Sequence, residues 1–315
     1  MMEDKFQIVG IQNPNEDAPN QVDIGRQEGV RPIFPRVVPI QKPRRHRDKP
    51  ILAIVLLLTI VTGCLACEMI MTKDPAYMDL KNYNLPPNGE FLFGTDSMGR
   101  DVFSMIWYGG RVSLFIGVLS TLASTAIAVV FGAASGIAPG WLDELLMRLT
   151  EILLSVPSLL LVVLIQAILG EANVFSISLV IGVTSWTSIA KVVRTEVRGL
   201  RESEYVIASK CMGGGFFHIL WHHLAPNFVS SIMFMVVMNV RGAIVAESTL
   251  SFMGIGLPLH VISWGSMLSL SEKALLTNSW WMILIPGIFL VVTLLSITSL
   301  GNFLQKSINA KQSNL

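Results

Sequence analysis

The chain has 315 residues, of which 52% are hydrophobic and only 14% are charged, and its mean hydropathy is +0.59. A water-soluble domain usually carries about 25% charged residues, so the composition argues for a lipid bilayer as the main solvent. The formal net charge of +1 gives no reason to expect a nucleic acid as partner. Cys64, Cys67 and Cys211 are too few and too scattered for a disulfide framework.

The first 50 residues precede the first apolar run and are predicted to form a flexible N-terminal tail. Residues 31–50 hold seven Lys or Arg residues and one acidic residue. Because basic residues close to a membrane span tend to stay in the cytoplasm, the tail is predicted to be cytoplasmic.

Apolar segments of about 20 residues, the length that crosses a bilayer as a helix, recur along the rest of the chain. The predicted spans are 51–71, 112–137, 145–169, 174–193, 228–247 and 281–304. Segment 72–111 is then extracytoplasmic, and the core 112–306 holds five of the spans. An even number of spans returns the C-terminal tail, 307–315, to the cytoplasm. The sequence therefore predicts an all-α membrane protein with six transmembrane helices and both termini cytoplasmic.

Charged residues flank two of these spans. Asp96, Arg100 and Asp101 lie in the extracytoplasmic segment and are predicted to brace it. Asp143 stands in an acidic stretch at the start of the third span, where carboxylates favour the positive end of a helix dipole.

The polar segment 204–227 interrupts the apolar pattern between the fourth and fifth spans. Apolar positions recur at helical spacing over residues 195–212, and three glycines follow at 213–215. Glycine ends helices because it adopts positive φ without steric cost. A second helical stretch begins at Phe216, and Pro226 stands where the next span is expected. The pattern predicts a helix, a sharp turn and a short helix on the cytoplasmic side.

This segment resembles the EAA loop of the membrane subunits of ATP-binding-cassette importers. Ala208 and Ser209 stand at its two small positions, Gly213 at its glycine and Pro226 at its end, whereas Ile207 replaces the family's glutamate. The resemblance implies contact with an ATPase subunit, and the residues expected to take part are Glu204, Ala208, Ser209, Gly213, Gly214, Leu224 and Pro226.

The resemblance extends over further segments in the same order. "FGTDSMGRDVFSMIWYGGRVSL" (93–114), "LDELLMRLTEILLSVPSLLL" (142–161) and "ESTLSFMGIGLPLHVISWGSML" (247–268) are similar to the C-type permease subunits of the dipeptide, oligopeptide and nickel branch. It implies the type I importer permease fold with a cytoplasmic coupling helix, in a prokaryotic cell membrane. The substrate expected from the larger part of this branch is a peptide, and nickel or a metal chelate is the alternative.

The same resemblance implies a multisubunit assembly. Its other members would be a second, B-type permease subunit, two ABC ATPase subunits and an extracytoplasmic solute-binding protein. The chain holds no G-x-x-x-x-G-K-[ST] phosphate-binding loop. We therefore expect no catalytic residues, cofactor or metal on this chain, and ATP and magnesium on the partner subunits.

Two charged residues fall within or at the end of the fifth span, where charge is costly and often functional. Arg241 and Glu247 are candidates for the translocation pathway. The alternative is a structural role, as an ion pair between helices or as side chains that reach the membrane surface.

Two other function classes stay open at this point. His218 and His222 share a helical spacing with His223 beside them, but a third ligand and a general base for a zinc enzyme are missing nearby. An ATP-independent secondary transporter is the second alternative, although such proteins often show repeated halves and these spans show no convincing repeat.

Overall fold

The computed structural model describes residues 50–170, 172–258, 260–271, 274 and 278–312. The predicted tail 1–50 therefore lies outside the described residues except for Pro50, and so does the end of the predicted tail 307–315. All statements on structure below concern the described part of the chain.

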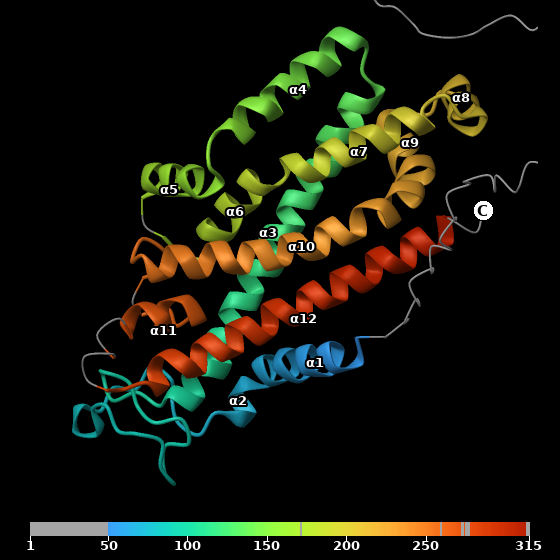
Figure 1. Cartoon of the computed structure of the whole chain (residues 1–315). Coiled ribbons are helices and arrows are strands. Elements are labelled where there is room, and N and C mark those ends of the chain that lie inside the picture. Colours follow the sequence, from blue (N-terminus) through green and yellow to red (C-terminus); the bar gives the residue numbers. More distant parts are fainter. Residues whose placement is uncertain (1–49, 171, 259, 272–273, 275–277, 313–315) are drawn as a thin grey trace, which may run out of the picture. The chain divides into compact units, whose positions relative to one another are not determined.

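The fold is all-α, as predicted: the described residues form helices and contain no strand, apart from one isolated bridge between Thr95 and Asp101 (Figure 1). The helices are α1 (Ile51–Leu65), α2 (Cys67–Ile70), the 3-10 turn Leu80–Asn82, α3 (Val102–Ile137), α4 (Gly140–Ser155), α5 (Ser158–Leu169), α6 (Val174–Ser185), α7 (Thr187–Leu200), α8 (Glu204–Cys211), α9 (Phe216–Ile219), the π-helical turn Leu220–Leu224, α10 (Ala225–Phe252), α11 (Trp264–Leu270) and α12 (Trp281–Gln312).

Helix α3, with 36 residues, is the centre of the packing. It packs against α6, α7 and α10, and α10 in turn packs against α12, which runs beside α1 (Figure 1). Small residues allow close approach of α3 to α7. A Cβ atom on Gly132 would lie 2.5 Å from the carbonyl oxygen of Ala190, and one on Gly136 would lie 2.7 Å from Cγ1 of Val197. Because glycine has no side chain at these positions, the backbones of the two helices come close to each other, as is common between membrane helices.

Three helical stretches are long and apolar enough to cross a membrane: α3, the stretch Phe216–Phe252 and Trp281–Ser307 of α12. Two bent pairs, α4 with α5 and α6 with α7, raise the number to five if each pair is one span, and α1 is a shorter apolar helix. Each of the predicted spans 145–169 and 174–193 consists of two helices that meet at a bend. The first is bent by 91° and the second by 46°.

The sharper bend has a local cause in the sequence. Pro157 disfavours helical backbone at the residue before it, and Val156 is extended, with φ −95° and ψ 131°. The predicted span 112–137 corresponds to the later part of α3, because the sequence analysis missed the beginning of this helix. Asp101 caps the helix by accepting the N–H of Ser104 at 3.1 Å, so α3 begins at Val102, ten residues earlier.

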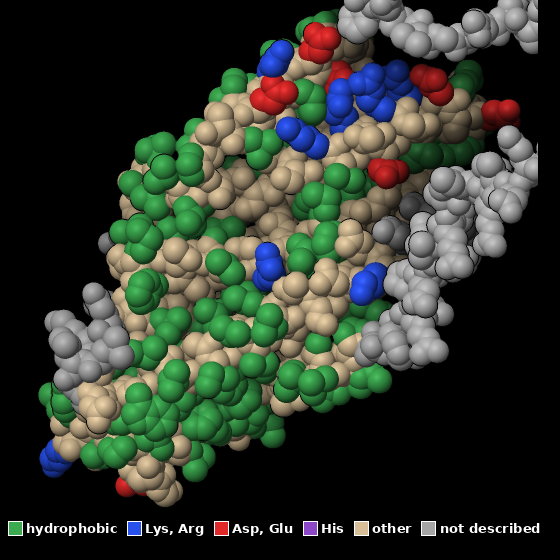
Figure 2. Space-filling view, in the orientation of Figure 1, with side chains coloured by type: hydrophobic (Ala, Val, Ile, Leu, Met, Phe, Trp, Pro, Cys, Tyr) green, Lys and Arg blue, Asp and Glu red, His purple; other side chains and the backbone are tan. Residues whose placement is uncertain are grey.

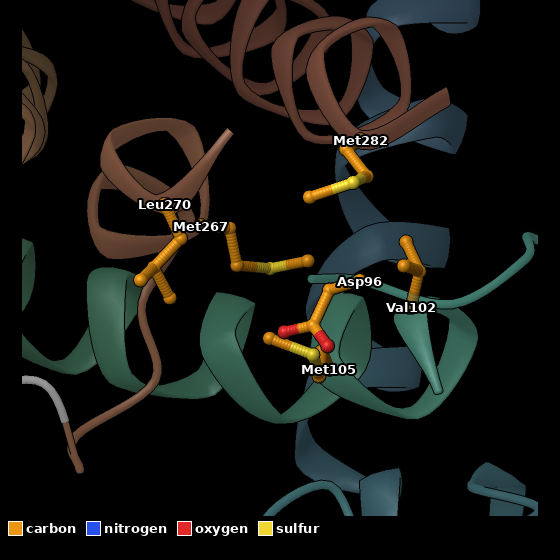
Figure 3. A pocket seen from close by; sticks show the side chains of 6 residues that line it. All are labelled: Asp96, Val102, Met105, Met267, Leu270 and Met282. Atoms are coloured by element: carbon orange, nitrogen blue, oxygen red, sulfur yellow. The ribbon is translucent and has the colours of Figure 1, made fainter. Parts of the chain in front are cut away.

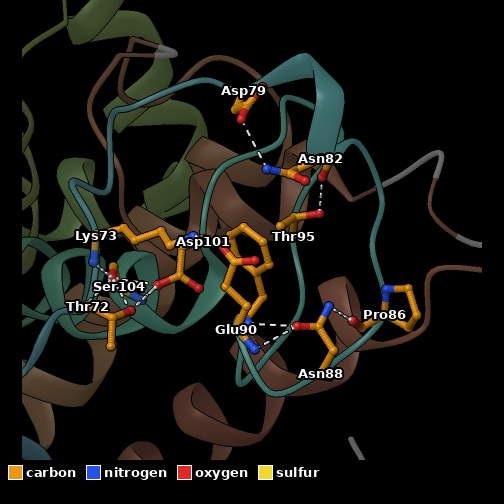
Figure 4. A network of polar contacts seen from close by, with 11 residues as sticks. Thr72, Lys73, Asp79, Asn82, Pro86, Asn88, Glu90, Thr95, Asp101 and Ser104 are labelled. Carbon is orange, nitrogen blue, oxygen red and sulfur yellow. Dashed lines mark hydrogen bonds and ion pairs between the residues drawn. The ribbon is translucent and has the colours of Figure 1, made fainter.

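The segment between α2 and α3 is held by polar contacts, as the sequence predicted for its charged residues, and those of Asp101 with Thr72 and Ser104 are drawn in Figure 4. Asp96 and Arg100 form an ion pair of 2.7 Å with side chains only 5% and 2% exposed. Asp101 accepts the hydroxyl of Thr72 at 2.9 Å as well as the Ser104 N–H. These contacts tie the segment to the beginning of α3.

Candidate functional site

Helix α8 ends in a glycine turn of the Schellman type. Gly213 has φ +85°, its N–H donates to the carbonyl of Lys210 at 3.0 Å, and the N–H of Gly214 donates to the carbonyl of Ser209 at 2.9 Å. These two bonds satisfy carbonyl groups that the end of a helix leaves free. The turn predicted at residues 213–215 is confirmed.

The three consecutive glycines are not equivalent. Gly213 has open space where a side chain would lie, so its requirement is the positive φ. A Cβ atom on Gly214 would lie 2.7 Å from Oγ and 2.8 Å from the carbonyl oxygen of Ser209, which is buried. Gly215 has neither restriction, because its φ is −73° and a Cβ atom there would meet no atom within 4 Å. Ser209 is therefore small because it packs directly under the turn.

The helices on either side differ from the prediction. A single helix over 195–212 was wrong, since α7 ends at Leu200 and α8 begins at Glu204. The hydroxyl of Ser203 donates to the carbonyl of Leu200 at 2.5 Å in this break. At the other end, α9 begins at Phe216 and α10 at Ala225, with Pro226 in its first turn as expected, but the π turn joins the two helices, so the chain is helical from Phe216 to Phe252. Proline has no N–H for the helical bond, and the helix accommodates it with the π turn just before α10.

Segment 204–227 has one face turned into the protein. Val206, Ile219, Leu220 and Leu224 are at most 3% exposed and belong to a hydrophobic cluster with residues of α3, α7 and α10. Of the residues singled out from the sequence, Ser209 and Leu224 lie on this buried face. The segment is therefore packed against the long helices and is not a loose loop.

The other face of the segment is exposed. Glu204, Ala208, Gly213 and Pro226 lie on it, and Gly214 is half-buried between the two faces. Large apolar side chains are exposed there as well: Tyr205, Ile207, Met212, Phe217 and Trp221. Charged side chains gather over α4, α7 and α8, whereas hydrophobic side chains dominate the opposite end of the visible face (Figure 2). The exposed face thus carries charged as well as large apolar side chains, a mixture suited to contact with another protein.

The three histidines lie on this segment without forming a metal centre. The rings of His218 and His222 stack at 4.4 Å, and His223 is 5.8 Å from His218. Within the described ranges, no group of three His, Cys, Asp or Glu side chains is arranged to hold a metal ion.

Arg241 and Glu247 do not meet. Arg241 is exposed and its Nη1 lies 3.4 Å from the hydroxyl of Thr298 on α12. Glu247 is fully buried. It accepts hydroxyl groups from four serines: Ser113 at 3.1 Å, Ser248 at 3.3 Å, Ser251 at 2.9 Å and Ser263 at 2.7 Å. The pathway role of both residues stays a prediction, but only Arg241 faces the outside of this chain.

Three of the serines around Glu247 carry a second contact that explains their orientation. Ser113 accepts the N–H of Trp264 at 3.2 Å, Ser251 that of Leu257 at 3.3 Å and Ser263 that of Ser266 at 3.1 Å. A hydroxyl that accepts an N–H remains free to donate its own proton to the carboxylate. Glu247 is thereby linked to α3, to the chain after α10 and to the first turn of α11.

A small cavity lies beside the segment that precedes α3. The thioethers of Met105, Met267 and Met282 line it, together with Asp96, Val102 and Leu270 (Figure 3). Its volume is about 10 Å³, the lower limit for one water molecule, so it is too small for a substrate.

A second charged cluster joins α4 to α7. Asp143 is 5% exposed and receives Nε of Arg194 at 2.5 Å, Nη1 of Arg198 at 3.0 Å and the hydroxyl of Ser135 at 2.5 Å. The two guanidinium groups favour the ionised form of the Asp143 carboxyl group. The sequence indicated a dipole role for Asp143 and did not reveal its partner, because Arg194 lies 51 residues away.

Comparison with known proteins places the chain in a family. The family described as "Binding-protein-dependent transport system inner membrane component" matches residues 128–314, more than half of the chain. The dipeptide transport system permease protein DppC of Bacillus subtilis is 38% identical over 74% of this chain and 72% of its own length. The oligopeptide transport system permease protein OppC of the same organism is 34% identical over 85% and 87%, and a putative peptide permease of Brucella suis is 34% identical over 83% and 86%. The chain therefore belongs to the binding-protein-dependent transport system inner membrane components, which are multi-pass, non-catalytic permease subunits of the cell membrane.

Proposed function

We propose that this chain forms half of the translocation pathway of an ATP-driven peptide importer, with a second permease subunit supplying the other half. The relatives described above are named as dipeptide, oligopeptide or peptide permeases, which favours peptides over nickel or a metal chelate. Selection of the cargo falls to an extracytoplasmic solute-binding protein, in keeping with the family description.

Two separate ATPase subunits bind ATP and magnesium and hydrolyse the nucleotide. The sequence of this chain has no phosphate-binding loop of the P-loop type, and its triple glycine forms a helix-ending turn instead. The energy of hydrolysis must then reach the spans through a contact between proteins. An ATP-independent transporter would need no such contact.

Segment 204–227 makes this contact on the cytoplasmic side, where both termini also lie. The observation that carries the proposal is its two-faced structure. Its buried face packs against α3, α7 and α10, and its exposed face presents Ile207, Phe217 and Trp221 to a partner. A groove in the ATPase that moves on nucleotide binding would displace the segment and the long helices together. Ile207 makes an apolar contact where the family pattern has a charged one.

Arg241 belongs to the wall of the pathway, because it is exposed on α10 and costs free energy in contact with lipid. Glu247 acts behind that wall, where its enclosed carboxylate fixes the position of α10 relative to α3 and α11. Arg241→Met is expected to lower peptide uptake at unchanged expression. Normal uptake by this variant would remove Arg241 from the pathway.

The matched substitutions Gly213→Val and Gly215→Val test the coupling role. Valine at position 213 must adopt a positive φ, whereas at position 215 it meets open space and an extended backbone. In the assembled complex in proteoliposomes, Gly213→Val is expected to reduce substrate-stimulated ATPase activity and uptake of radiolabelled dialanine and penta-alanine at least tenfold. Gly215→Val should stay within twofold of the wild type. If Gly213→Val behaves like its neighbour, the segment does not carry the coupling.

A further inference from the structure

Helix α4 is attached to the protein at few points. Of its 16 residues only Asp143 and Thr150 are buried, and α3 and α7 are its main neighbours among the described helices. Trp141, Leu145 and Ile152 are exposed on its surface. Asp143 is therefore the main polar anchor of α4 to the rest of the chain.

The partners of this anchor lie on the helix that leads into segment 204–227. Arg194 and Arg198 belong to α7, which ends at Leu200, four residues before α8 begins. Nε and Nη2 of Arg194 donate to the two carboxylate oxygens of Asp143. This bidentate contact is the strongest geometry for a guanidinium and a carboxylate.

The end of α7 is itself fixed to α3 and to α8. Gly136 of α3 meets Val197 closely, and the Gly136 carbonyl accepts Nη1 of Arg201 at 3.4 Å. Val197 and Val206 of α8 belong to the same hydrophobic cluster. Packed side chains thus connect α8 to α7, and Asp143 connects α7 to α4.

We propose that Asp143 is a positioning residue that makes α4 follow α7 when segment 204–227 moves, so that the movement reaches α5 beyond the bend at Pro157. This inference rests on the proposed function, since it assumes that force enters through that segment. The ion-paired carboxylate transmits movement because the other contacts of α4 are few: Thr150 is buried, and Leu153 packs against the hydrophobic cluster that includes residues of α7.

The test uses the complete complex with Asp143→Asn, Arg194→Gln and the double variant. Removing either partner should lower dialanine and penta-alanine uptake at least tenfold, while ATPase activity stays within twofold of the wild type. The double variant should be no worse than the more affected single variant, because both remove the same contact. The control is Glu151→Gln, which breaks the exposed 2.8 Å pair of Glu151 with Arg148 on the same helix and should leave uptake unchanged.

A distance measurement separates transmission of movement from a purely structural role. Spin labels at the exposed positions Glu144 and Lys210, in a Cys211→Ser background that removes the exposed cysteine, report the distance between α4 and α8. In the otherwise unaltered protein this distance should be the same in nucleotide-free and vanadate-trapped complexes. With Asp143→Asn it should differ between the two states.

Each outcome decides the matter. Equal losses of uptake, ATPase activity and complex yield would mean that Asp143 only supports folding, and an unchanged distance in Asp143→Asn would overturn the proposal even if uptake fell. Wild-type uptake in both single variants would overturn it as well. Failure of the unaltered chain to form a complex with ATPase subunits would instead overturn the proposed function.

Discussion

The hydroxyl of Ser263 donates to Oε1 of Glu247 at 2.7 Å while it accepts the N–H of Ser266 at 3.1 Å. The residue that caps α11 is therefore also the anchor of α11 on α10. Because Ser113 of α3 donates to the same carboxyl group and accepts the N–H of Trp264, three helices meet at one buried acidic side chain. Such a network is stable only when every member is satisfied.

Glu247→Gln should destabilise the protein, because an amide offers one acceptor oxygen where the carboxylate offers two. At least one serine hydroxyl then loses its acceptor in a buried site, at a cost of about 1–3 kcal/mol. We expect a lower melting temperature of the detergent-purified protein. Glu68→Gln is the control, because Glu68 is 73% exposed and pairs with Arg111 at 3.0 Å. Equal melting temperatures for the two variants would contradict the role given to the serine network.

The approach of α3 to α7 predicts opposite effects of alanine at two glycines. Gly136→Ala places a Cβ atom 2.7 Å from Val197 and 3.0 Å from the carbonyl oxygen of Arg194, and should cost about 1–3 kcal/mol. Gly199→Ala, on α7 with open space around it, should be neutral or stabilise by up to about 1 kcal/mol. Thermal unfolding in detergent measures both, and a stabilising Gly136→Ala would show that the two helices are not in close contact there.

Trp221→Ala is expected to weaken the binding of the ATPase subunits, because Trp221 lies on the exposed apolar face of segment 204–227. Trp221 is 60% exposed, and its removal from the centre of an interface should cost about 2 kcal/mol, which is roughly a 30-fold loss of affinity. The measurement is binding of the purified ATPase subunits to permease in nanodiscs. Met69→Ala, which truncates an equally apolar side chain that is 89% exposed on α2, should leave affinity unchanged. Unaltered binding by Trp221→Ala would place the ATPase elsewhere.

The buried pair of Asp96 and Arg100 predicts a large penalty for losing one partner. Arg100→Met leaves the Asp96 carboxylate without its guanidinium in a site that is about 5% exposed, and should destabilise the protein by about 3–5 kcal/mol. Glu90→Gln, which removes the 2.6 Å partner of Lys73 at 70% exposure, should have little effect. Expression level and melting temperature report both, and a well-expressed, stable Arg100→Met protein would show that the pair does not brace this segment.

Local signals in the sequence predicted local structure well. The apolar runs predicted an all-α membrane protein, and three consecutive glycines predicted the turn at Gly213, since only glycine reaches that φ without strain. The predicted boundaries of the helices were less accurate near prolines. Pro157 bends the predicted third span, whereas Pro226 lies in the first turn of α10 as expected, and a π turn keeps the chain helical before it.

The sequence by itself determined what each segment requires. Long apolar helices require a lipid environment, and the turn at Gly213 requires a residue without a Cβ atom. Only the tertiary structure decided which charges are satisfied and by which partners. Asp143 meets Arg194 across 51 residues and Glu247 meets Ser113 across 134. Contacts over such separations depend on how whole helices pack, and no local propensity specifies that packing.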